Sequence, residues 1–163
     1  MHIPQSTYRL QLHSGFPFSA AEAIADYLGD LGISHVYASP IMASLAGSGH
    51  GYDQLDPERI DPELGGADGF EPLQGRCREI GLGWIQDIVP NHMAYSADNF
   101  RMADVLEKGP KSPYAGHFDV EWDHPHPTLS GRLSAPFLGR PYGECLRDGE
   151  LQLAFERGRL FLT

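Results

Sequence analysis

The residues with the clearest chemical potential lie at positions 87–92, which read Asp-Ile-Val-Pro-Asn-His. Asp87 interrupts an otherwise apolar, strand-like run, and Asn91 and His92 follow it closely. In parallel α/β sheets and barrels, functional side chains gather at the carboxyl ends of the strands. Three polar side chains at one such end therefore predict a functional site. The alternative interpretation is a solvated strand end at which Asp87 caps a turn.

A second candidate site is the tetrapeptide that runs from His50 to Asp53. Gly51 allows close approach of the backbone, Tyr52 offers a flat face for stacking, and Asp53 can accept hydrogen bonds from hydroxyls. Such a surface suits a sugar ring, and the alternative is a turn with a packed tyrosine. The preceding glycines at 47–51 do not form a phosphate cradle, because no Gly-Lys-Ser/Thr follows and no helix is expected there.

Residues 117–126 hold three histidines and three carboxylates, which are the ligand types of metal sites. Their spacing matches no standard zinc or calcium loop, and Pro125 restricts the backbone. A solvated acidic loop, anchored by Phe118 and Trp122, is therefore favoured over a metal site. His13 and His35 are interpreted as packing or surface residues.

Three strands are expected to position the candidate residues, at 7–12, 33–38 and 82–89. In the first, apolar and polar side chains alternate, as in a strand with one buried face. The other two are short apolar runs. Residues 41–66 show no sustained periodicity and predict a long loop, which in a compact domain usually has a function.

Two helices are expected between these strands. Ser19 and Glu22 resemble a capping box, and apolar residues follow at helical spacing up to Gly32, namely Ala20, Ala23, Ile24, Tyr27, Leu28 and Leu31. The second helix has Pro72 in its first turn, Gly81 just past its end, and an apolar face of Phe70, Leu73, Cys77 and Ile80. This order of elements predicts parallel strands with the helices outside.

The second half of the chain has a different character. Residues 94–149 show no clear period and predict an irregular region or a small inserted domain. Beyond them, Leu153, Phe155, Leu160 and Leu162 alternate with other residues on both sides of Arg157-Gly158. That pattern predicts a terminal β-hairpin.

The composition restricts the class of protein. The chain has 163 residues, 41% of them hydrophobic, so a packed core is expected. Its formal charge of −10 would repel a phosphate backbone, which argues against a nucleic-acid partner. No signal peptide and no membrane span are apparent, so a soluble cytoplasmic protein without a membrane partner is expected. Cys77 and Cys145 are expected to be buried free thiols.

Residues 87–92 resemble the first signature region of the α-amylase-type glycoside hydrolase clan, family 13, in which an Asp at the end of barrel strand three is followed by Asn and His. Within that clan the chain most resembles the maltooligosyl trehalose synthase family. The stretches that carry this resemblance extend over nearly the whole chain: residues 7–11, 35–40, 50–53, 62–66, 109–114 and 141–144.

This resemblance implies an α/β fold. Residues 1–93 would be the first part of a (β/α)8 TIM barrel, about three β/α units, and residues 94–163 the start of an irregular or β domain inserted after barrel strand three. A complete barrel typically has about 250 residues, so the chain is expected to be a truncated part of one.

The resemblance also assigns roles in binding a maltooligosaccharide or maltodextrin substrate. Tyr52 would stack on the glucose at the cleavage subsite, His92 would bond its hydroxyls, and Asp53 and Asp87 would hold the architecture. His50 and Asn91 complete the expected substrate-binding set: His50, Tyr52, Asp53, Asp87, Asn91 and His92. Asn91 is a calcium ligand in many α-amylases, but the trehalose-forming branch is not generally calcium-dependent, so neither a metal nor a cofactor is expected.

The family reaction turns the reducing-end α-1,4 linkage of a maltooligosaccharide into an α,α-1,1 linkage through a covalent glucosyl-enzyme intermediate. Such retaining transfer needs two carboxylates about 5–5.5 Å apart, and the clan carries them after strands four and five. Arg147-Asp148 lacks the residue that the clan places between its Arg and its nucleophile, so we expect no catalytic residue in this chain. The missing remainder of the barrel is then an expected partner.

Two other functions are compatible with the same residues. One is part of another α-amylase-type hydrolase or of a 4-α-glucanotransferase, because the signature at 87–92 does not distinguish among these enzymes. The other is a non-catalytic maltodextrin-binding module that retains Tyr52 and His92.

Overall fold

The computed structural model describes residues 3–134 and 137–162. The chain divides into two compact units, Met1–His117 and Phe118–Thr163. None of the helices among the described residues is long and apolar enough to cross a membrane.

The first unit is built on a sheet of three parallel strands, which confirms the expected parallel arrangement. The strands β1 (Thr7–Leu10), β2 (His35–Ala38) and β5 (Gly83–Gln86) lie in the order β1-β2-β5. Each strand is shorter than expected, and side chains make some of the hydrogen bonds at the strand ends. The Leu12 amide, for example, donates to the Ser39 hydroxyl, 2.8 Å away, and β1 stops at Leu10.

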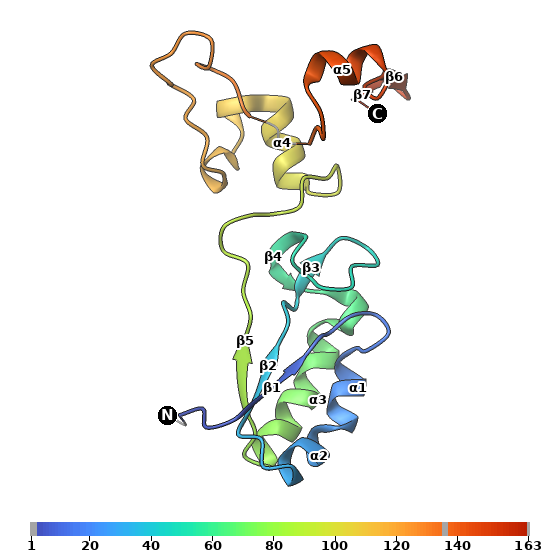
Figure 1. The fold of residues 1–163 in the computed structure, drawn as a ribbon, viewed down its shortest axis with the longest axis vertical. Helices are drawn as coiled ribbons and strands as arrows, with labels where there is room; N and C mark the ends of the chain where they lie inside the picture. Colours follow the sequence, from blue (N-terminus) through green and yellow to red (C-terminus); the bar gives the residue numbers. More distant parts are fainter. Residues whose placement is uncertain (1–2, 135–136, 163) are drawn as a thin grey trace. The chain divides into compact units, whose positions relative to one another are not determined.

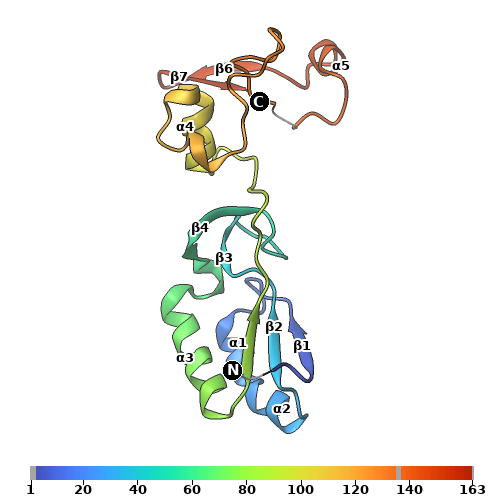
Figure 2. The ribbon, with the colours of Figure 1, turned by 90° about the vertical axis from the view of Figure 1, so that its left-hand side faces the viewer.

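Three helices, α1 (Phe18–Ala23), α2 (Ala25–Asp30) and α3 (Gly66–Glu79), cover one face of this sheet (Figures 1 and 2). The core lies between the two layers and includes Leu10, Phe18, Val36, Ala38 and Leu73, each at most 4% exposed. Burying this apolar surface is the main force that holds the helices on the sheet. The other face of the sheet carries polar side chains.

The helix expected over residues 20–31 is two helices, and the expected capping box is wrong. Helix α1 begins at Phe18, after Pro17, and no side chain caps it. Phe18 is fully buried and packs on Phe70 of α3, with ring centroids 5.2 Å apart, which favours an earlier start. The backbone breaks at Ile24, and Tyr27 is 61% exposed instead of packing in the core.

The long loop expected at 41–66 contains an antiparallel pair, β3 (Met42–Ser44) and β4 (Gln54–Ile60), followed by a 3-10 turn, η1 (Pro62–Leu64). The pair has register shifts, and β4 contains a proline, so neither strand shows a regular alternation in sequence. Asp61 stabilises the end of the hairpin. Its carboxylate accepts hydrogen bonds from the Glu63 amide and from the amide and hydroxyl of Ser44.

Helix α3 begins at Gly66, before the expected apolar face, so Pro72 lies inside the helix and not in its first turn. Its expected end is confirmed, because Gly81 follows the helix with a φ of +73°. Cys77, buried in the core on α3, and Cys145, buried in the second unit, are both free thiols, as predicted.

Residues 94–149 are more regular than expected. The first unit ends with α4 (Phe100–Lys108) and the 3-10 turns η2 (Gly109–Lys111) and η3 (Ala115–His117). Asn99 caps α4 by accepting from the Met102 amide and also donates to the Ala94 carbonyl. A cap of this kind starts a short helix that has too few turns for a convincing periodic pattern.

The second unit contains α5 (Tyr142–Arg147) and the hairpin of β6 (Leu153–Glu156) and β7 (Arg159–Leu162). The expected hairpin is confirmed, with its turn at Arg157 and Gly158, which both have positive φ. That geometry is the type I′ turn that joins two antiparallel strands through two residues.

Candidate carbohydrate site

Four polar residues from four parts of the chain converge at the carboxyl end of the parallel sheet. Arg9 and Tyr37 are register partners on β1 and β2, Tyr52 lies between β3 and β4, and Asp87 directly follows β5. Asp87 Oδ2 accepts from the Arg9 guanidinium at 3.1 Å, from the Tyr37 hydroxyl at 3.2 Å and from the Tyr52 hydroxyl. Asp87 therefore stands at the sheet edge where it was expected, with its charge fully partnered.

These contacts favour the ionised form of Asp87. The hydrogen bond from Tyr52 lowers the pKa of Asp87, and those from Arg9 and Tyr37 lower it further, against the opposite effect of burial. The same bond to Asp87, together with burial, raises the pKa of Tyr52. At neutral pH the site thus combines a carboxylate with a neutral phenol, and Asp87 is a poor general acid.

The loop that carries Tyr52 is held by close backbone contacts. Gly51 has a φ of +75°, and a Cβ atom at this position would lie 2.7 Å from the Pro40 carbonyl oxygen. Gln11 lies just beyond β1, and its side-chain amide donates to the backbone carbonyls of Gly49 and His50. The close approach at Gly51, expected from its residue type, is therefore confirmed as a contact with the turn after β2.

Asp53 and His50 face their own loop. The Asp53 carboxylate accepts from the Ser48 hydroxyl, and the same hydroxyl accepts from the Gly51 amide at 3.1 Å. His50 accepts from the Tyr52 amide at 3.0 Å, and its ring stacks on the Tyr52 ring at 5.9 Å between centroids. His50 therefore orients the tyrosine ring, and Asp53 holds the loop that carries it.

His92 and Asn91 come to the same place from the segment after β5. His92 Nε2 lies 3.1 Å from the Tyr52 carbonyl oxygen, and its Nδ1 lies 3.1 Å from the Asn91 amide oxygen. All six residues singled out in the sequence thus belong to one connected cluster around Tyr52. The arrangement offers an aromatic ring with imidazole, amide and carboxylate groups around it, which can stack on and hydrogen-bond a polyhydroxyl ligand.

Two members of the cluster, Arg9 and Tyr37, were missed in the sequence. Arg9 is one of the polar side chains of the alternating strand expected at 7–12, and Tyr37 lies in the apolar run expected at 33–38. The alternation of side chains along a strand could have indicated both residues, because every second residue of a strand lies on the same face of the sheet. Arg9 and Tyr37 share the face on which Asp87, two residues beyond Ile85, emerges from β5.

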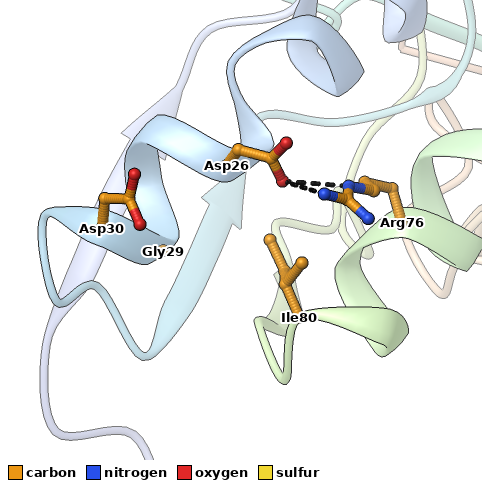
Figure 3. A pocket seen from close by; sticks show the side chains of 5 residues that line it. All are labelled: Asp26, Gly29, Asp30, Arg76 and Ile80. Atoms are coloured by element: carbon orange, nitrogen blue, oxygen red, sulfur yellow. Dashed lines mark hydrogen bonds and ion pairs between the residues drawn. The ribbon is translucent and has the colours of Figure 1, made fainter.

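Of two hollows in the first unit, the smaller adjoins this cluster. A hollow of about 160 Å³ beside Asp87 is lined largely by apolar residues from β3, β4 and the segment after β5, among them Met42, Pro57 and Val89. A larger one of about 490 Å³ lies between α2 and α3, before the amino ends of β2 and β5 (Figure 3). There the Arg76 guanidinium is already paired with Asp26 and Glu79, so we place the functional site at Asp87.

The histidines and carboxylates of residues 117–126 do not converge on a common point that could hold a metal ion. His124 lies 3.9 Å from Glu121, whereas His126 pairs with the Thr128 hydroxyl. Among the described residues, no three His, Cys, Asp or Glu side chains are placed to hold a metal ion. His13 and His35 are interpreted from the sequence as packing or surface residues. His35 is buried over Gly83 of β5, and His13 forms an isolated bridge with Phe16. Asp148, at the end of α5, pairs with Arg140.

Comparison with known sequences gives a consistent group of relatives. Residues 23–140 match the family model for the catalytic domain of alpha amylase. The chain is 42% identical over 168 residues to a putative maltooligosyl trehalose synthase of Mycobacterium tuberculosis strain H37Rv, covering 94% of this chain and 21% of the relative. It is 40% identical over 107 residues to a cyclomaltodextrinase of Thermoanaerobacter pseudethanolicus, covering 63% and 18%. The chain thus spans about a fifth of the length of these curated relatives.

Solved structures give the same grouping. A crystal structure of a maltooligosyl trehalose synthase superimposes with a TM-score of 0.83 at 39% identity, over 99% of this chain and 22% of that one. The maltooligosyltrehalose synthase of Arthrobacter ramosus gives 0.81 at 38% identity, over 97% and 20%. A debranching enzyme of Nostoc punctiforme gives 0.58 at 31% identity, over 76% and 23%. These matches confirm the expected fold class, the α/β first part of a TIM barrel.

Proposed function

This chain belongs to the alpha-amylase family of catalytic domains, and we propose that it forms the substrate-binding part of a maltooligosyl trehalose synthase. That enzyme would convert the reducing-end α-1,4 linkage of a maltooligosaccharide into an α,α-1,1 linkage. The choice of a trehalose-forming enzyme over a hydrolase is supported by coverage, because the synthase match spans 94% of the chain and the cyclomaltodextrinase match 63%.

The observation that carries the proposal is the tethered ring of Tyr52. Its hydroxyl is bonded to Asp87 and Arg9, while the backbone on either side is held by His50 and His92. A ring fixed at its edge and flanked by hydrogen-bonding side chains presents its face to a pyranose. We assign Tyr52 to stacking on the glucose at the cleavage subsite and His92 to its hydroxyls.

The remaining residues of the cluster have supporting roles in this proposal. Asp87 and Asp53 hold Tyr52 and its loop, and His50 and Asn91 lie beside the sugar. Asp87 remains ionised and accepts three hydrogen bonds on one oxygen, so it holds its neighbours and does not protonate the leaving oxygen.

The bond-making carboxylates would come from outside these 163 residues. Retaining transfer requires a nucleophile and an acid about 5–5.5 Å apart across the glycosidic bond. In the proposed enzyme, residues 1–93 belong to the barrel and residues 94–163 to the domain inserted after its third strand. The rest of the barrel would then supply the catalytic pair opposite Tyr52.

The test uses the complete enzyme that contains this chain. Tyr52→Ala is expected to raise the KM for maltopentaose about tenfold, which corresponds to roughly 1.4 kcal/mol of lost contact. Tyr27→Ala is the matched control, because Tyr27 is 61% exposed on α2 and takes no part in the site. Loss of reducing ends without release of glucose identifies the trehalose-forming reaction.

Two results would contradict the proposal. One is release of reducing sugars as the main product, which would indicate a hydrolase. The other is conversion of maltopentaose by the 163-residue chain alone, which would mean that the chain carries its own catalytic carboxylates.

A further inference from the structure

We infer that Arg9 is a positioning residue of the sugar site, which joins Asp87 to Tyr52 and so holds the stacking ring in place from β1. The inference deepens the proposed function and rests on it only for the part that concerns sugar. Nothing in the sequence motif at residues 87–92 points to Arg9, because it lies 78 residues away from Asp87.

The two branches of the Arg9 guanidinium make different contacts. Nη1 lies 3.1 Å from Asp87 Oδ2, and Nη2 lies 3.0 Å from the Tyr52 hydroxyl. The guanidinium carbon lies 4.5 Å from the centroid of the Tyr37 ring, within the range of a cation–π contact. A planar fork stacked on an aromatic ring has a fixed direction, which the single ammonium of a lysine does not provide.

The contacts around Arg9 also define how Tyr52 can be used. A tyrosine hydroxyl has one proton to donate, and Tyr52 donates it to Asp87 while accepting from Arg9. The hydroxyl therefore has no proton left for a ligand. Tyr52 therefore offers the ligand its ring and no hydroxyl proton, and Arg9 acts with Asp87 and His50 to fix the direction in which that ring points.

The charge of Arg9 has an effect that does not depend on sugar. The groups that face it are Asp87 after β5, Tyr37 on β2 and Tyr52 in its loop. Among these, Arg9 is the cation that favours ionised Asp87 and opposes the rise in the pKa of Tyr52. Removing the Arg9 charge should therefore raise the pKa of Asp87, and should raise the pKa of Tyr52 further above its ordinary value. Each pKa is observed as the midpoint of the group's titration.

The first test measures these midpoints in the 163-residue chain without any ligand. The carboxyl carbon of Asp87 and the phenol carbon of Tyr52 are followed by NMR in the unsubstituted protein, in Arg9→Gln and in Arg9→Lys. We expect both midpoints to rise in Arg9→Gln, and to stay nearer their original values in Arg9→Lys, which keeps the charge. Arg78→Gln, which removes the same charge from the exposed surface of α3, should move neither midpoint.

The second test measures maltopentaose kinetics of the same variants in the complete enzyme. We expect Arg9→Gln to raise KM about tenfold through misplacement of the ring, and Arg9→Lys to recover only part of it because the fork is lost. Tyr52→Phe should raise KM at least as much as Arg9→Gln, since it removes the hydroxyl through which both Arg9 and Asp87 hold the ring. Circular dichroism of each variant separates misfolding from misplacement.

The outcomes decide the inference separately from the proposed function. Unmoved midpoints in a folded Arg9→Gln protein overturn the positioning role whatever the enzyme does. Moved midpoints with an unchanged KM overturn the link from Arg9 to the sugar site. If the complete enzyme does not act on maltopentaose, the proposed function fails, and the NMR midpoints alone then support or overturn the coupling of Asp87 to Tyr52 by Arg9.

Discussion

The Arg101 guanidinium, on the first turn of α4, binds the Asp56 carboxylate of β4 at 2.9 Å. Its side chain is only 5% exposed, and its second branch reaches Glu58 at 2.6 Å. Nearer the site, the Gln54 carbonyl accepts from the Ala94 amide at 2.8 Å. Alternate residues of β4 thus hold the segment that leads from His92 into α4, so this ion pair stabilises the chain next to the cluster around Tyr52.

Replacing Arg101 by methionine is expected to lower the free energy of unfolding by about 1.5–3 kcal/mol, the range for hydrogen bonds to charged groups. Urea denaturation, followed by the fluorescence of Trp84 in a Trp122→Phe background, measures it. Glu58→Gln is the control, because the Glu58 side chain is 76% exposed and an exposed pair contributes little. A loss in Glu58→Gln as large as in Arg101→Met would contradict a special role of the buried contact.

The cost of losing Arg101 should depend on pH. Burial raises the pKa of Asp56, but hydrogen bonds from the Glu58 amide and Arg101 outweigh it and lower the pKa. A carboxyl with a lowered pKa stabilises the fold above its unfolded value of about 4, and this stabilisation disappears as the pH falls further. The difference between the original chain and Arg101→Met should therefore be largest at neutral pH and shrink at pH 3.

Gly51→Ala is expected to disrupt the loop that carries Tyr52. The added methyl group would lie 2.7 Å from the Pro40 carbonyl oxygen, at a φ of +75°. Gly47→Ala is the matched control, because Gly47 has almost the same φ, +76°, and open space around the added carbon. Both variants bear a backbone cost of about 1–2 kcal/mol. Only Gly51→Ala should also weaken maltopentaose binding in the complete enzyme, and equal effects of the two would refute the contact with Pro40.

The turn of the β6–β7 hairpin can be improved. Arg157 has a φ of +49°, which is unfavourable for a non-glycine residue but tolerated by asparagine. Arg157→Asn should stabilise the hairpin by a few tenths of a kcal/mol, whereas Gly158→Ala, at a φ of +80°, should cost about 1 kcal/mol. Cross-strand NMR contacts between Leu153 and Leu162 report the hairpin population, and a gain in Gly158→Ala would show that the turn is of another type.

The two thiols should react slowly in the folded chain. Burial raises the pKa of Cys77, and a hydrogen bond to Glu150 together with burial raises that of Cys145. Because the thiolate is the reactive form, alkylation by iodoacetamide at pH 8 should be slow until urea unfolds each unit. Mass spectrometry after timed quenching measures both sites. Rapid labelling of Cys77 in the absence of urea would show that the α3 face of the core opens.

The elements that the sequence predicted well are those with a strong local pattern. The parallel arrangement of β1, β2 and β5, the end of α3 before Gly81 and the terminal hairpin all follow from short apolar runs and turn residues. The β3–β4 pair was missed because its register shifts and Pro57 break the alternation. Helix α1 was misplaced because the packing of Phe18 on Phe70 outweighed a plausible capping box.

By itself, the sequence indicated six residues of the candidate site, but not Arg9 or Tyr37, and the family to which the chain belongs, because motifs such as residues 87–92 are contiguous and readable without a fold. Only the tertiary structure decided how these residues are held. Arg9 meets Asp87 across 78 residues and Arg101 meets Asp56 across 45. Contacts between residues so far apart in the sequence leave no local pattern that could be recognised. They depend on strand register and on the packing of one segment against another.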